Sequence, residues 1–101
     1  MTDDDGGLLT VRLRISGTVQ GVWYRGWAVE TARVLGVGGW VRNRADGTVE
    51  ALVHGSETAV EKMIAACRSG PPAARVSDVT CHPATAGSEE LAGGFRQRPT
   101  E

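Results

Sequence analysis

The first hydrophobic pattern lies close to the N-terminus. Apolar and polar side chains alternate from Leu9 to Ile15, and a period of two predicts a strand with one buried face and one solvent-facing face. The polar segment before it, residues 1–7, is predicted to form a flexible leader. Gly17 and Gly21 follow the strand and are predicted to bracket a short loop.

Apolar residues at helical spacing come next. Tyr24 and Ala28 fall on one face of a predicted first helix, and Gly36 is placed to end it. A second helix is predicted between Ser56, a residue type that caps helix N-termini, and Gly70, which two prolines follow. The sequence therefore predicts two helices of about three turns each.

Two strands lie between these helices. Val37–Asn43 is mostly apolar, and Thr48–His54 alternates apolar and polar side chains. Asp46-Gly47 separates the two segments, and this dipeptide readily adopts the positive φ angles of a tight hairpin turn. We therefore predict a β-hairpin in the middle of the chain.

The C-terminal third has a weaker pattern. We predict a strand around Val76–Val79, a loop over residues 83–94 and a short last strand over Phe95–Arg98. The order strand, helix, strand, strand, helix, strand is a split βαβ arrangement. It predicts an α+β fold, an antiparallel sheet with two helices on one face and the other face in water, and a single domain over residues 8–98.

Composition and charge narrow the function classes. The chain has 101 residues and a formal net charge of −1, which fits one small domain and argues against a nucleic-acid or anionic-membrane partner. Residues 6–44 nevertheless have a local net charge of +5. No apolar run is long enough for a membrane span, and no basic and then apolar signal sequence opens the chain, so we predict a cytoplasmic protein.

Cys67 and Cys81 lack metal-site spacing and are interpreted as two buried small side chains, with a disulfide between them left open.

The segment Gly17–Arg25 is the first candidate for chemistry. Glycines let the chain curl so that successive amides point inward, and a helix start adds free N–H groups and a positive dipole end. Arg25 could add a bidentate contact to two oxygens of an anion. The spacing alone fits a phosphate cradle, and it also fits a plain tight turn in which Arg25 is solvated.

A second segment, Gly38–Gly47, favours the phosphate cradle over the plain turn, because together the two segments closely resemble the acylphosphatase family. The resemblance runs from about Val11 to Val79. The matching motifs are Gly17–Val22 with Tyr24 and Arg25, Leu35-Gly36, Gly39–Asn43 with Asp46–Glu50, and Gly70-Pro71-Pro72 with Ala74 and Val76.

The resemblance implies a ferredoxin-like βαββαβ sandwich and a hydrolase of the carboxyl–phosphate bond of acyl phosphates. It implies Arg25 and Asn43 as the catalytic residues, Arg25 on the phosphate and Asn43 on the attacking water. The implied phosphate-binding loop consists of Gly17, Thr18, Val19, Gln20, Gly21, Val22, Trp23 and Tyr24. The rings of Trp23 and Tyr24 are expected to narrow the pocket mouth.

The expected partner is a small-molecule acyl phosphate, and free phosphate or sulfate is expected to fit the same loop. No metal and no cofactor are expected, because a departing carboxylate, with a conjugate acid of pKa about 4, needs no proton from the enzyme. No nucleic acid or membrane partner is expected, and we predict a monomer.

Other hypotheses remain open. An Arg-bearing sheet face, with Arg12, Arg14, Arg42 and Arg44, would suit a phosphate- or RNA-binding module without turnover. A regulatory domain of a larger protein is a third possibility. His54 and His82 are interpreted as surface residues rather than bases, Asp46 as a turn residue and Glu50 as the cross-strand partner of an Arg.

Overall fold

The structure, a computed structural model, describes residues 7–101. Of the predicted leader, only Gly7 lies within this range. The elements in chain order are β1 (Leu8–Thr18), α1 (Tyr24–Leu35), β2 (Gly38–Asn43), β3 (Val49–Ser56), α2 (Glu57–Ser69), β4 (Arg75–Pro83), α3 (Ser88–Leu91) and β5 (Phe95–Gln97).

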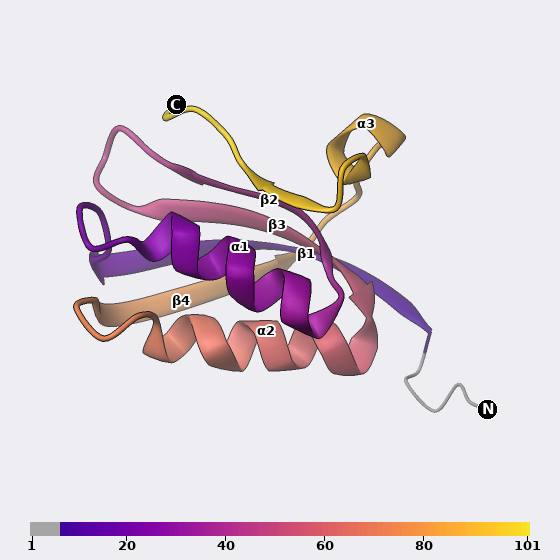
Figure 1. Cartoon of the computed structure of the whole chain (residues 1–101), viewed down its shortest axis with the longest axis horizontal. Helices are drawn as coiled ribbons and strands as arrows, with labels where there is room; N and C mark the ends of the chain where they lie inside the picture. Colours follow the sequence, from indigo (N-terminus) through magenta and orange to yellow (C-terminus); the bar gives the residue numbers. More distant parts are fainter. Residues whose placement is uncertain (1–6) are drawn as a thin grey trace.

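The strands form one sheet in the order β4-β1-β3-β2-β5, and α1 and α2 lie side by side on one face of it (Figure 1). This confirms the predicted α+β, ferredoxin-like fold. The prediction of a wholly antiparallel sheet is wrong at one edge, because β5 pairs parallel to β2, with Phe95 opposite Gly39. The chain crosses the sheet between β4 and β5, and it therefore enters β5 in the direction of β2.

The core lies between the sheet and the two long helices. The alternating pattern that predicted β1 places Leu13 and Ile15 in this core, both fully buried. Met63 of α2 and Ala28 of α1 cover them from the helix side. Each large apolar side chain buried in this way contributes about 1.5–3 kcal/mol, so the helices are held mainly by this one layer.

The opposite face of the sheet is less exposed to solvent than predicted. Trp40 and Leu52 lie on it and are only 2% and 0% exposed. The indole Nε1 of Trp40 donates a hydrogen bond of 3.2 Å to Glu90, and the guanidinium groups of Arg42 and Arg98 lie 4.7 and 5.2 Å from its ring centroid. The prediction of a fully wet face is therefore wrong around Trp40.

The segment predicted as a loop, residues 83–94, contains the end of β4 and the short helix α3. The Glu90 side chain accepts a hydrogen bond of 3.0 Å from the amide of Gly87 and so closes the single turn. Without an apolar stripe, such a short helix gives no periodic signal in the sequence. No helix within residues 7–101 is long and apolar enough to cross a membrane.

The two cysteines are both free, so they form no disulfide with each other. Cys67 of α2 is buried, and burial raises the pKa of its thiol to about 11. Cys81 is exposed on β4, which makes the prediction of two buried side chains wrong for this residue.

Candidate active site

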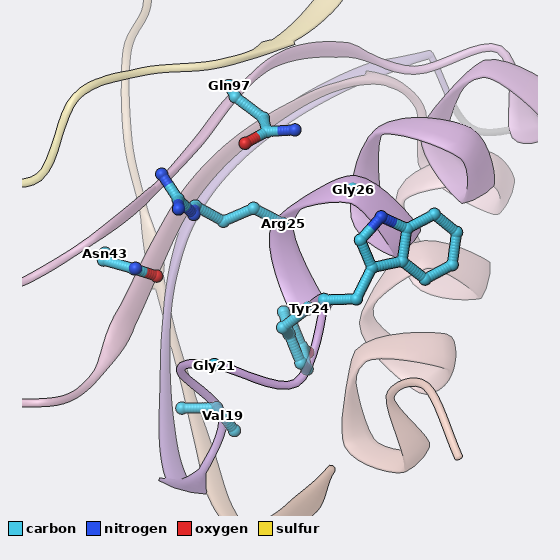
Figure 2. Close-up of a pocket in the computed structure, with 8 residues that line it drawn as sticks. Val19, Gly21, Tyr24, Arg25, Gly26, Asn43 and Gln97 are labelled. Atoms are coloured by element: carbon cyan, nitrogen blue, oxygen red, sulfur yellow. The ribbon is translucent and has the colours of Figure 1, made fainter. Parts of the chain in front are cut away.

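A cavity of about 140 Å³ lies where the N-terminus of α1 faces the ends of β2 and β5 (Figure 2). It brings Arg25 and Asn43 together from two segments that are distant in the sequence. The residues that line it are Val19, Gly21, Trp23, Tyr24, Arg25, Gly26, Asn43 and Gln97.

The loop over residues 19–23 curls at the start of α1. Gly21 and Trp23 both have positive φ angles, 77° and 66°. The N-cap residue Trp23 makes no side-chain hydrogen bond to α1, and the first turn holds no acidic residue. Within residues 7–101, the first amides of the helix therefore have no side-chain acceptor, and they combine with the positive end of the helix dipole to favour an anion.

The cation and the amide of the site are available for a ligand. Within residues 7–101, neither Arg25 nor Asn43 forms a side-chain hydrogen bond, and Arg25 forms no ion pair. Both side chains are half-buried. Figure 2 shows the guanidinium of Arg25 and the carboxamide of Asn43 on the same side of the cavity. The structure thus places these two predicted residues in one site.

Only part of the predicted loop reaches the cavity. Gly17 and Thr18 belong to β1, where they pair with Val76 and Arg75 of β4 after a shift of register at Ser16. Neither residue lines the cavity, and their assignment to the phosphate loop stays a prediction. Val22 does not line the cavity either, because its side chain packs against the hydrophobic core.

Gln20 has a different part in the site. Its side-chain Nε2 donates hydrogen bonds of 2.8 and 2.9 Å to the carbonyl oxygens of Arg44 and Thr48. These two residues begin and end the turn that follows Asn43. Gln20 therefore does not point into the cavity; it ties the loop to the turn beside Asn43.

The two aromatic residues of the loop differ. Tyr24 is 2% exposed, and its hydroxyl donates a 2.8 Å hydrogen bond to the carbonyl of Cys67. Burial raises the pKa of this phenol above its usual value, so it remains a donor. The expectation that the ring of Tyr24 narrows the mouth is wrong, whereas Trp23 is 59% exposed and lies at the edge of the cavity.

Gln97 is a lining residue that sequence analysis missed. It lies opposite Val41 in the parallel pair of β5 and β2, and this pairing brings it under the first turn of α1. A polar residue in a short terminal strand gave the only signal. The parallel pairing of β5 could not be inferred from the residues themselves.

The other candidate groups lie elsewhere. His54 bonds Thr10 at 2.6 Å and stands opposite Gly38, five residues along β2 from Asn43, or about 17 Å at strand spacing. His82 pairs with Arg12 and is likewise distant from the loop after β1.

The acidic candidates have structural partners, as predicted. Asp46 accepts hydrogen bonds from the amide and hydroxyl of Thr48, which hold the pKa of its carboxyl below the usual value. Glu50 is 4% exposed and pairs with Arg12, Arg42 and Arg44. Within residues 7–101, no three His, Cys, Asp or Glu side chains are grouped closely enough to hold a metal ion.

Comparison with known proteins identifies the family. The acylphosphatase family model matches residues 11–96. A protein named Acylphosphatase from Rhodospirillum rubrum is 63% identical over 90% of this chain and 97% of its own length, and one from Rhizorhabdus wittichii is 53% identical over 88% and 87%. A solved acylphosphatase from Coxiella burnetii superimposes with a TM-score of 0.84 at 30% identity over 97% of this chain and all of its own. The chain belongs to the acylphosphatase family.

Proposed function

We propose that the chain hydrolyses acyl phosphates to a carboxylate and inorganic phosphate, with Arg25 and the loop amides holding the phosphoryl group and Asn43 orienting the attacking water. The observation behind this assignment is that Arg25 and Asn43 share one cavity with the uncapped N-terminus of α1. The family supports the substrate class, a small-molecule acyl phosphate.

The chemistry suits a site with so few ionisable groups. In a loose transition state for phosphoryl transfer, charge spreads over the phosphoryl oxygens, and donors fixed in advance around those oxygens lower the barrier. Arg25 and the amides of residues 21–25 are such donors. The acyl oxygen leaves as a carboxylate, whose conjugate acid has a pKa near ~4, so no general acid is required.

Asn43 supplies position rather than a proton. Its carboxamide can accept from and donate to a single water molecule and so hold the water in line with the bond that breaks. The water oxygen forms the new bond to phosphorus, and its proton passes to a phosphoryl oxygen. No side-chain base is needed at any step.

The size of the cavity sets how the substrate enters. A volume of about 140 Å³ is below the ~300–1,000 Å³ of pockets that enclose drug-sized ligands. The phosphoryl group would fill it, with the acyl group in the opening beside Trp23 and Gln97. Free phosphate or sulfate would occupy the same place.

An RNA-binding role has less support. Three of the arginines on the open sheet face, Arg12, Arg42 and Arg44, pair with the buried carboxylate of Glu50. Among the described residues, that face presents no exposed aromatic platform of the kind on which RNA-binding sheets stack bases, since Trp40 is buried. Cytoplasmic location, independence of metal and the monomeric state remain predictions.

The test is release of phosphate from an aromatic acyl phosphate in the presence of a chelator. Arg25→Ala should lose binding and rate, by about 10²-fold or more, and Asn43→Ala mainly rate. Arg33→Ala, which removes an exposed charge from the last turn of the same helix, is the matched control. Full activity in Arg25→Ala or Asn43→Ala would overturn the residue assignment, and a strict need for metal would overturn the mechanism.

A further inference from the structure

Gln97 is the polar lining residue to which the proposed mechanism gives no role. It lies opposite Val41, and residues two apart on a strand share a face, so Gln97 is on the sheet face of Asn43. Gln97 lies on the strand next to that of Asn43 and is displaced from it by two residues along the strand, which corresponds to about 8 Å between their Cα atoms. Gln97 lines the cavity, and in the view of Figure 2 the guanidinium of Arg25 lies between Gln97 and Asn43.

The side chain is free and its backbone is fixed. Within residues 7–101, Gln97 makes no side-chain hydrogen bond. Phe95, two residues earlier, is 1% exposed, and the amide of Arg98 donates a 2.9 Å hydrogen bond to the carbonyl of Val41. The backbone of Gln97 is therefore held beside the cavity, and its carboxamide is available to a ligand.

The geometry of in-line displacement indicates which reacting group lies at each end of this cavity. The attacking water and the departing oxygen stand on opposite sides of phosphorus. If Asn43 holds the water and Arg25 the phosphoryl oxygens, the departing oxygen faces away from Asn43, toward Gln97. We propose, on the basis of the function proposed above, that Gln97 Nε2 donates a hydrogen bond to the departing carboxylate and so acts as a further catalytic residue.

The step balances without a proton from Gln97. The bond between phosphorus and the acyl oxygen breaks, and both of its electrons pass to that oxygen, while the water oxygen bonds to phosphorus. The proton of the water goes to a phosphoryl oxygen. Gln97 stabilises the charge that develops on the acyl oxygen, and this stabilisation grows with the basicity of the leaving carboxylate.

Gln97→Met keeps the length of the side chain and removes the donor. Its kcat/KM should be measured with a series of benzoyl phosphates whose ring substituents run from electron-withdrawing to electron-donating. We expect a loss of about tenfold for the poorest leaving group and less than about threefold for the best, so that the dependence on leaving-group pKa becomes steeper. Competitive inhibition by inorganic phosphate, which has no acyl oxygen, should stay within about twofold of the wild type.

The matched control is Arg96→Met, because Arg96 precedes Gln97 on β5 but bonds the carbonyl of Glu89 outside the cavity. Its leaving-group dependence should equal that of the wild type. An equal loss for all substrates in Gln97→Met, or weaker phosphate inhibition, would overturn the proposal, since Gln97 would then act on structure or on the phosphoryl group. Those outcomes would leave the proposed function intact, whereas a wild type without turnover would overturn both.

Discussion

The indole of Trp23 lies against the backbone of Gly26. A β-carbon built on Gly26 would come 2.1 Å from the indole Nε1, so the glycine leaves the space that the ring occupies at the mouth of the cavity. Within residues 7–101, Trp23 is the only non-glycine residue with a positive φ, 66°. This left-handed backbone costs a residue with a β-carbon roughly 1–2 kcal/mol. The residue before α1 is therefore strained in a position that the loop requires.

Replacing Trp23 separates this strain from the contact of the ring. Trp23→Gly and Trp23→Ala both remove the indole, but only glycine adopts the left-handed backbone without penalty. We expect the glycine variant to exceed the alanine variant by about 1 kcal/mol in the free energy of unfolding. Urea denaturation of the two variants measures the difference, and equal stabilities would show that the backbone at residue 23 is not strained.

Tyr24 should matter for stability rather than for catalysis. Its hydroxyl bonds the carbonyl of Cys67, whose helical partner four residues later would be Pro71, which has no N–H. Tyr24→Phe leaves that carbonyl buried without a donor, and we expect a loss of about 1–2 kcal/mol in the free energy of unfolding. Since the phenol faces the core, kcat and KM should stay near wild-type values. A fall in kcat without a fall in stability would place the hydroxyl in the reaction.

The main elements of the fold could be predicted because the core pattern is local. Val11, Leu13 and Ile15 alternate with polar residues, and the helices end at Gly36 and Gly70, where the sequence places its breakers. The direction of β5 and the helix α3 could not be predicted. The direction of β5 and the formation of α3 both depend on the path of a segment that has no hydrophobic periodicity. That path involves contacts between residues far apart in the sequence, such as the hydrogen bond from Trp40 to Glu90.

Only part of the candidate site could be predicted, because local motifs mark some of its residues and long-range strand pairing brings in the others. Arg25 and Asn43 were identified through motifs, and the structure brings them together. Gln97 enters the cavity through a pairing of strands that are far apart in the chain. Gln20 was assigned to phosphate, but its amide bonds two backbone carbonyls. The sequence of a glycine-rich loop does not indicate which of its side chains bind a ligand and which form hydrogen bonds to neighbouring backbone groups.

Gln20→Ala should impair catalysis without removing a group from the cavity. The variant loses both hydrogen bonds between the loop and the turn after Asn43, so the distance between the loop amides and the water-orienting amide is no longer fixed. We expect kcat/KM to fall about tenfold, because small displacements of reacting groups are costly, and stability to fall by about 1–2 kcal/mol. Thr18→Ala, an exposed change at the end of β1, is the control. Equal kcat/KM in the two variants would contradict a positioning role for Gln20.

The two glycines that bracket the loop should differ in what they tolerate. A β-carbon on Gly17 would come 2.1 Å from the carbonyl oxygen of Arg75, a backbone atom that cannot swing away, and φ there is +120°. Gly21 has a φ of +77° and nothing within 4 Å. Gly17→Ala should therefore cost about 3 kcal/mol or more, from the clash and the backbone together, whereas Gly21→Ala should cost about 1 kcal/mol, from the backbone alone. Urea denaturation of both variants checks this order, and equal losses would mean that β4 does not approach β1 as closely as the structure places it.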